Sequence, residues 1–313
     1  MKVRSRKLLW LVRIIVLVLL LAVIGCLSTI RLDSTGLIIQ EEKEFVMYPE
    51  KDKRIVLEGL VGRMALSDNG ERGVYIQSLS DNQVQIAEVN LKTCEITTLV
   101  TAEQLEKGMR EAGETAYTGK IQERPKSVKY VKNTDAVSFI WANSLYTMDL
   151  ESGKIQCVLR NYDQSPLAVE GLEYEWIDEN RFVYVTVDRF NCIFLYNLLT
   201  HERQFVQYGS GVCSYNEDGR IVCYEKYIKD STIWVQYYEF TVINIQSFEK
   251  EKTLTYKIDE LISQNVEHAI FHVGDNGIIV WGEENGNRLY LCDYQSRITW
   301  IKILPGKKVY SIL

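Results

Sequence analysis

The chain has 313 residues, of which 25% are charged, 46% are hydrophobic and only 4 are proline. This composition excludes a disordered, a collagen-like or a multi-pass membrane protein, and the length suits one large domain or two ordinary ones. Residues 1–13 carry five basic residues and no acidic one, which leaves 31 basic against 42 acidic residues in the rest of the chain. Because so acidic a body repels phosphate backbones, no nucleic-acid partner is expected.

An apolar segment follows the basic N-terminus. Residues 8–30 contain a single charge, Arg13. The uninterrupted part, residues 14–30, would form about 25 Å of helix, slightly less than the hydrocarbon core of a membrane. Because basic residues stay on the cytoplasmic side, we expect residues 1–7 to form a cytoplasmic stub, residues 8–30 a transmembrane signal anchor, and residues 31–313 an extracytoplasmic domain.

Two other interpretations of this segment involve cleavage. Val23-Ile24-Gly25-Cys26 resembles a bacterial lipobox, so the signal could end before a lipidated Cys26. The apolar run continues through Leu27 to Ile30, which favours the uncleaved single-pass anchor, and simple secretion is the third interpretation. All three place the body outside the cytoplasm, with the membrane and a protein or cell-envelope component as expected partners.

Five short segments repeat along the body. Each has a hydrophobic lead-in, then Asn or Asp, an apolar or aromatic residue, any residue, and Ser or Thr, with steps of 59, 48, 47 and 49 residues between them. They begin and end at Asn90 and Thr93, Asp149 and Ser152, Asn197 and Thr200, Asn244 and Ser247, and Asp293 and Ser296. Asn, Asp, Ser and Thr side chains close turns on the backbone, so each segment predicts a hairpin corner.

The segments around each corner alternate as β-strands do. A unit consists of strand, turn, strand, loop, strand, corner and strand, and four antiparallel strands per period of about 48 residues are typical of a β-propeller blade. A β-sandwich, the alternative fold, has no reason to repeat at this spacing. Five units are plain, and we expect KVYSIL at the C-terminus to pair with N-terminal strands such as GLIIQ and EFVMY. This pairing would complete six four-stranded blades, with five or seven as alternatives.

Residues 60–304 resemble the β-propellers of the TolB-like and quinoprotein-like kind, whose outer hairpins contain sequences such as Asp149-Leu-Glu-Ser-Gly-Lys154. The Gly-His and Trp-Asp signatures of WD-type repeats are absent. The quinoprotein tryptophan is missing as well, because Cys157 stands at its place in the second repeat and Trp300 falls one position early. The resemblance therefore implies an architecture and carries over no functional residue.

A helical insert is predicted at residues 101–117, between the first two units. Thr101-Ala-Glu-Gln104 has the pattern of a capping box, and Leu105, Met109 and Ala112 follow at helical spacing. We expect this helix to cover the rim of the propeller, with a partner-docking element as the alternative.

Unit four is rich in aromatic residues. Alternation places half of them in the core, and the expected recognition edge is the loop from Glu225 to Ser231, with Tyr227, Trp234 and Tyr237 as its candidate residues. Such aromatics would serve protein contacts or carbohydrate stacking.

Other candidate sites are few. His268 and His272 lie four apart on a predicted strand without nearby ligands, and no nucleophile elbow, HExxH, EF-hand loop, phosphate loop or GxGxxG occurs. No catalytic, metal or cofactor site is therefore assigned. Cys213 and Cys223 lie symmetrically about Asp218, so a tight hairpin would oppose them as a disulfide.

The sequence thus predicts an all-β, membrane-anchored extracytoplasmic propeller that acts as a non-catalytic binding or scaffolding module. The alternatives are a propeller enzyme of the polysaccharide lyase or glycosidase type, with its site in the central funnel, and a carbohydrate-binding sensor.

Overall fold

The structure is a computed structural model, and its description covers part of the chain. The described residues are 37–41, 44–50, 53–79, 83–113, 125–141, 144–160, 173–187, 191–214, 220–230, 235–257, 269–274, 277–282, 288–292, 298–303 and 308–312. The predicted anchor at residues 8–30, with Cys26, lies outside these ranges. Among the described residues no helix is long and apolar enough to span a membrane.

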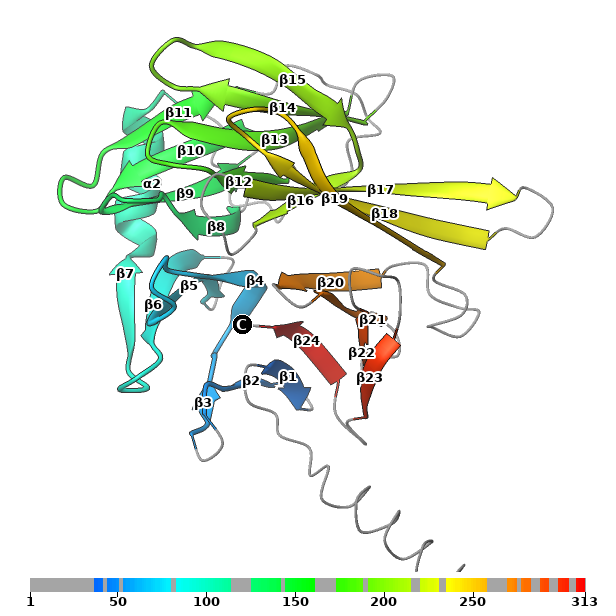
Figure 1. The fold of residues 1–313 in the computed structure, drawn as a ribbon. Coiled ribbons are helices and arrows are strands. Elements are labelled where there is room, and N and C mark those ends of the chain that lie inside the picture. The colour runs from blue at the N-terminus through cyan, green and yellow to red at the C-terminus, as the bar shows by residue number, and fades with distance from the viewer. Residues whose placement is uncertain are drawn as a thin grey trace, which may run out of the picture.

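The described residues form six four-stranded antiparallel sheets, arranged around a common centre (Figure 1). We call these sheets blades 1 to 6 and give the innermost strand of each first. Blade 1 contains β24 (Lys308–Ile312), β1 (Leu37–Glu41), β2 (Glu44–Tyr48) and β3 (Ile55–Val56). Blade 2 contains β4 (Leu60–Leu66), β5 (Arg72–Ser78), β6 (Val84–Asn90) and β7 (Ile96–Val100), and blade 3 contains β8 (Lys126–Tyr130), β9 (Ala136–Trp141), β10 (Ser144–Asp149) and β11 (Ile155–Leu159).

The remaining three blades follow the same order. Blade 4 contains β12 (Tyr174–Trp176), β13 (Arg181–Val187), β14 (Asn191–Asn197) and β15 (Glu202–Tyr208). Blade 5 contains β16 (Gly211–Ser214), β17 (Arg220–Asp230), β18 (Val235–Asn244) and β19 (Lys250–Lys257), and blade 6 contains β20 (Ala269–Gly274), β21 (Gly277–Gly282), β22 (Arg288–Cys292) and β23 (Ile298–Ile303). The prediction of an all-β fold built from four-stranded units is confirmed.

The ring closes where the two ends of the propeller meet. β24 pairs antiparallel with β1, with Leu37 opposite Ile312 and Gln40 opposite Lys308. The C-terminal strand thus supplies the inner strand of blade 1, and the N-terminal strands supply the outer three. This confirms the predicted pairing and covers two strand edges that would otherwise be open.

The core is divided among the interfaces between neighbouring blades. Because side chains alternate along a strand, each blade presents one apolar face to the blade before it and one to the blade after it. Separate buried clusters join blades 1 and 2, 2 and 3, 3 and 4, and 4 and 5. Each of these interfaces therefore has a hydrophobic core of its own.

Helix α2 (Ala102–Glu111) lies in the connection between blades 2 and 3. Thr101 and Gln104 form the capping box, with both reciprocal hydrogen bonds present. Leu105 and Met109 are buried in the cluster shared by blades 2 and 3, where the helix packs against the outside of that interface.

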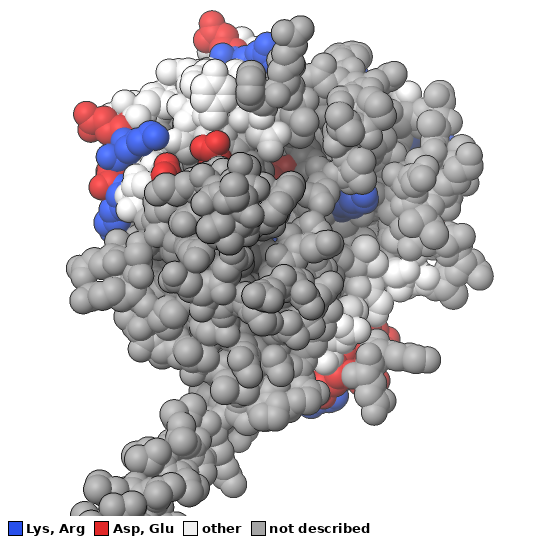
Figure 2. Space-filling model, turned by 90° about the vertical axis from the view of Figure 1, so that its right-hand side faces the viewer, with Lys and Arg blue, Asp and Glu red and all other residues white. Residues whose placement is uncertain are grey.

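Figure 2 shows acidic and basic residues side by side at several places among the described residues of this face. Opposite charges at these places lie close enough to offset one another.

Candidate functional site

The predicted corner residues lie at the outer hairpins of different blades, so the fold spreads them around the ring. In each described corner, Oδ1 of the leading residue accepts a hydrogen bond from the backbone N–H three residues later, and the Ser or Thr at that position accepts one from the N–H two residues further on. The N–H to Oδ1 distances are 3.0 Å from Thr93 to Asn90, 2.7 Å from Ser152 to Asp149, 3.3 Å from Thr200 to Asn197 and 3.3 Å from Ser247 to Asn244. Asp293 and Ser296 lie outside the described residues.

Each of these corners also contains a residue in the left-handed region. The values of φ are 64° at Cys94, 69° at Gly153, 57° at His201 and 58° at Phe248. A non-glycine residue there costs about 1–2 kcal/mol. Glycine, the usual sequence signal for this conformation, is present in only one of the four described corners.

The predicted disulfide between Cys213 and Cys223 is wrong, because both are free thiols. The hairpin is offset by one residue from the predicted symmetry, so Cys213 lies opposite Val222 and Cys223 opposite Val212. Since side chains alternate along strands, the two thiols point to opposite faces of blade 5. Burial raises the pKa of Cys213 to about 12, which keeps this thiol protonated and weakly nucleophilic.

The loop predicted from Glu225 to Ser231 is a strand over residues 225–230, which continue β17, and the recognition role of Tyr227, Trp234 and Tyr237 stays a prediction. Tyr227 and Tyr237 lie opposite one another on β17 and β18, in a hairpin that projects from the ring (Figure 1). Trp234 and His268 lie outside the described residues. Within the described part of the chain, no group of three or more His, Cys, Asp or Glu side chains could hold a metal ion.

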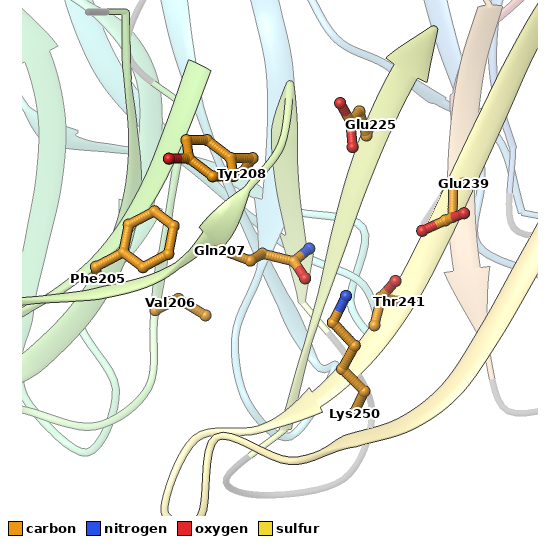
Figure 3. Close-up of a pocket in the computed structure, with 8 residues that line it drawn as sticks. All are labelled: Phe205, Val206, Gln207, Tyr208, Glu225, Glu239, Thr241 and Lys250. Atoms are coloured by element: carbon orange, nitrogen blue, oxygen red, sulfur yellow. The ribbon is translucent and has the colours of Figure 1, made fainter. Parts of the chain in front are cut away.

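A groove of about 230 Å³ lies between the outer strand of blade 4 and the facing side of blade 5. It is lined by Phe205, Val206, Gln207 and Tyr208 of β15, Glu225 of β17, Glu239 and Thr241 of β18, and Lys250 of β19. Figure 3 shows the two aromatic rings on one side and the two carboxylates on the other. We call this the blade 4–5 groove.

A bulge in β15 aligns the aromatic side of the blade 4–5 groove. Phe205 lies opposite Phe194 and Tyr208 opposite Cys192, with a register shift between them at Val206. Without that extra residue, positions 205 and 208 would face opposite sides of the sheet. The ring centroids of Phe205 and Tyr208 are 5.2 Å apart, and the two side chains remain 46% and 58% exposed. About half of each aromatic side chain is therefore exposed at the surface.

The acidic side comes from the register of β17 and β18, which places Glu225 directly opposite Glu239. Like charges directly opposite one another destabilise a sheet. Among the described residues neither carboxylate forms an ion pair, and Lys250 is the one basic residue among those that line the groove. The groove lining therefore carries a net negative charge.

A second polar cluster surrounds Glu173 at the central end of the same interface. The Tyr224 hydroxyl donates to both Glu173 carboxylate oxygens at 3.0 Å, and the Val212 N–H donates to Oε2 at 3.3 Å. Gly211 makes this arrangement possible, because a Cβ there would lie 2.1 Å from Cζ of Tyr224 and 2.3 Å from a Glu173 oxygen. The cluster thus links the inner strands of blades 4 and 5.

Protein atoms crowd the Glu173 carboxyl although the residue keeps solvent contact. Its partial loss of hydration raises the pKa of Glu173, opposed by the Tyr224 hydrogen bond and the positive charge of Arg63. The same loss of hydration raises the pKa of Tyr224 well above its usual range. The pair of Glu173 and Tyr224 can therefore offer a protonated oxygen. The next carboxylate along the chain, Glu175, already forms an ion pair with Lys129.

Most of these residues could not be recognised as site residues from the sequence. Glu225 was included only as the start of a loop, and the aromatic pair looked like ordinary outer-strand positions. The opposition of Glu225 and Glu239 depends on a long-range register, and the alignment of Phe205 with Tyr208 depends on a bulge. Neither feature has a local sequence signal.

Comparison with known proteins identifies the architecture. No protein-family model and no curated protein sequence matches the chain. Among solved structures, TolB from Acinetobacter baumannii is 13% identical, with a TM-score of 0.58 over 92% of this chain and 68% of that chain. A chain of a nidogen–laminin complex is 9% identical, with a TM-score of 0.48 over 88% and 94% of the two chains. The β-propeller domain of the Trilobed protease from Pyrococcus furiosus is 12% identical, with a TM-score of 0.46 over 83% and 73%. Identities this low report on the fold alone, and the chain has a TolB-like β-propeller architecture.

Proposed function

We propose that this protein is a membrane-anchored, extracytoplasmic β-propeller that binds a protein or cell-envelope partner and has no catalytic activity of its own. The apolar run at residues 8–30, preceded by basic residues, supports the anchor and its orientation. The blade 4–5 groove supports the binding role.

The observation that carries the binding role is the exposed aromatic pair in that groove. Phe205 and Tyr208 are 46% and 58% exposed although other large side chains of this interface, such as Ile193 and Val183, are fully buried. Aromatic residues next to polar groups are the usual anchors of protein interfaces, because they bury a large area and lose little rotamer entropy. A partner that covers this groove would therefore gain both apolar burial and polar contacts.

Site-specific crosslinking in intact membranes tests the binding role. A photoreactive phenylalanine analogue at Tyr208 of the full chain should give a discrete protein or envelope adduct. The same analogue at Leu199, which is 73% exposed on the adjacent corner, should not. Absence of an adduct from Tyr208 and from every other exposed blade position would overturn the binding role.

The orientation needs its own measurement. A membrane-impermeant maleimide applied to intact cells should label a Leu199→Cys variant above the wild-type background and should leave a Ser5→Cys variant unlabelled. Labelling of the second variant alone would reverse the proposed orientation. Recovery of the wild-type chain in the soluble fraction would remove the anchor.

The Glu173 cluster supports a second candidate, an enzyme that acts on a cell-surface polymer from the centre of the ring. The observation in its favour is the raised pKa of Glu173, combined with the Tyr224 hydroxyl at 3.0 Å. A carboxyl with a raised pKa can act as a general acid. Release of polymer fragments by the wild-type chain, lost in Glu173→Gln and Tyr224→Phe, would establish this function, and no release would dismiss it.

A further inference from the structure

We infer that the blade 4–5 groove receives the side chain of an arginine or lysine from a protein partner. This inference rests on the proposed binding function and makes it more specific by naming the chemistry of the contact. The other arrangements of polar groups, at Glu173 and at the corners, already have partners within the fold.

The groove lining has a negative charge that a cationic side chain would complement. Glu225 and Glu239 lie directly opposite one another on adjacent strands, and within the described part of the chain neither forms an ion pair. Lys250 leaves one negative charge uncompensated among the lining residues. A cation between the two carboxylates would replace a repulsion by two charge-assisted hydrogen bonds.

The aromatic side of the groove also suits a cation. Phe205 and Tyr208 offer exposed rings across from the carboxylates (Figure 3). The adjoining ring of Phe194, in edge contact with Phe205 at 5.8 Å, already carries the Arg203 guanidinium 5.2 Å from its centroid. This aromatic surface therefore accommodates a cation–π contact in the protein itself, and the exposed rings could make another.

A hydroxyl also lies among the residues that line the groove. Thr241 comes from β18, and its side-chain oxygen can accept a hydrogen bond from a donor in the groove. Arginine and lysine both supply such donors in addition to their charge.

The size of the groove fits one long side chain. The groove volume of about 230 Å³ is below the range of about 300–1,000 Å³ that is usual for pockets that enclose whole drug-sized ligands. A single long side chain, presented by a larger partner that rests on the surrounding surface, suits a groove of these dimensions. The occupant is therefore a residue of a protein partner.

The direct test uses peptides and the full chain in detergent micelles. An array of nonapeptides with a central arginine and varied flanks is compared with the same array carrying citrulline, which has the same shape without the charge. We expect arginine peptides to bind at least about tenfold more tightly than their citrulline counterparts, with lysine peptides between them, and the preference to weaken as salt is added. Equal binding of arginine and citrulline peptides would overturn the inference.

Variants locate the contact. Glu225→Gln combined with Glu239→Gln should abolish the preference for arginine over citrulline. Phe205→Ala combined with Tyr208→Ala should weaken the binding of the arginine peptides by about fivefold or more. Lys250→Met should strengthen binding of cationic peptides, which a merely structural role of the groove would not predict. Glu103→Gln combined with Glu111→Gln on the exposed face of α2 makes the same change in net charge and should have no effect. An unchanged preference in the groove variant, or an equal loss in the α2 variant, contradicts the inference.

The crosslinking experiment separates this inference from the function on which it rests. If the wild-type chain and the Glu225→Gln, Glu239→Gln variant capture the same partner equally well, the groove assignment fails and the binding function stands. If neither chain captures a partner from any exposed position, the binding function itself fails. Free arginine as a competitor should reduce capture by the wild-type chain only.

Discussion

Two interfaces between neighbouring blades differ at their outer ends. Between blades 2 and 3, the connection from β7 to β8 contains α2, which packs into the interface (Figure 1). Between blades 4 and 5, only Gly209 and Ser210 connect β15 to β16, and the outer end holds the groove. The same position on the ring is therefore filled with apolar side chains in one case and left open, aromatic and acidic in the other.

At the interface of blades 2 and 3, apolar side chains of α2 stabilise the outer end by close packing. Leu105 and Met109 are fully buried against strands of both blades. Gly108 lets the helix approach closely, because a Cβ there would lie 2.7 Å from Cδ1 of Ile155. A glycine inside a helix costs about 1 kcal/mol, and here that cost permits tight packing. By contrast, the open interface keeps the rings of Phe205 and Tyr208 largely exposed, so these side chains bury less apolar area than Leu105 and Met109 do.

The largest expected effect is at the filled interface. Leu105→Ala should lower the free energy of unfolding by about 2–5 kcal/mol, because it leaves a cavity between α2 and two blades. Urea denaturation of the full chain measures this change. Leu199→Ala, at a position that is 73% exposed, is the matched control and should change the value by less than about 0.5 kcal/mol. Equal effects of the two substitutions would show that α2 does not fill the interface.

The inner end of the open interface should also be sensitive to packing, with a smaller loss of stability than at the filled one. Gly211→Ala should lower the free energy of unfolding by about 1–3 kcal/mol, because the new methyl group meets the Tyr224 ring and the Glu173 carboxylate. The loss should be smaller in a Tyr224→Ala background, where the ring is absent. Denaturation of the two single variants and the double variant gives the coupling directly. Additive losses would contradict a clash with the ring.

Much of the fold could be predicted because its signals are local and repeated. Asx corners depend on hydrogen bonds within four residues, and the capping box of α2 depends on Thr101 and Gln104 alone. The pairing of β24 with β1 could be predicted without a local signal, because a ring must cover its open edges. Repetition at nearly constant spacing then supplied the architecture.

The site could not be predicted in the same way, because it depends on register. A one-residue offset in the β16–β17 hairpin moved Cys223 away from Cys213 and removed the predicted disulfide. The bulge at Val206 and the pairing of Glu225 with Glu239 likewise depend on strand contacts that no short segment determines. Register errors of one residue reverse the face of every side chain, so groove residues are harder to predict than strands.

A substitution in the open interface should have a smaller effect and should stabilise the protein rather than destabilise it. Glu239→Gln should raise the free energy of unfolding by up to about 1 kcal/mol, because it removes the repulsion from Glu225. Glu103→Gln on α2, which changes the net charge equally, should not stabilise the protein. Thermal and urea unfolding of both variants at low salt measure the difference. A destabilised Glu239→Gln variant would mean that this carboxylate contributes to folding rather than to binding.

The smallest expected effect is on the pH dependence of stability. It concerns the corners of blades 3 and 4, because one begins with a charged residue, Asp149, and the other with a neutral one, Asn197. Hydrogen bonds from the Ser152 hydroxyl and N–H lower the pKa of Asp149 below its usual value of 3.8, whereas the matching residue of blade 4, Asn197, does not titrate. The carboxylate bonds therefore stabilise the folded state above pH 3.8, and this contribution is lost as the pH falls through the lower pKa of the folded protein.

Asp149→Asn should consequently make the decline of stability in acid less steep. The corner itself should keep its conformation, because the equivalent corners of blades 2 and 4 begin with an asparagine, Asn90 and Asn197. The reciprocal change, Asn197→Asp, should steepen the decline. Unfolding free energies between pH 2 and pH 7 test both directions. Since the Asp149 side chain is at the surface, the change in slope should be small and should shrink with added salt. Parallel profiles for wild type and both variants would show that the two corners are held by backbone hydrogen bonds alone.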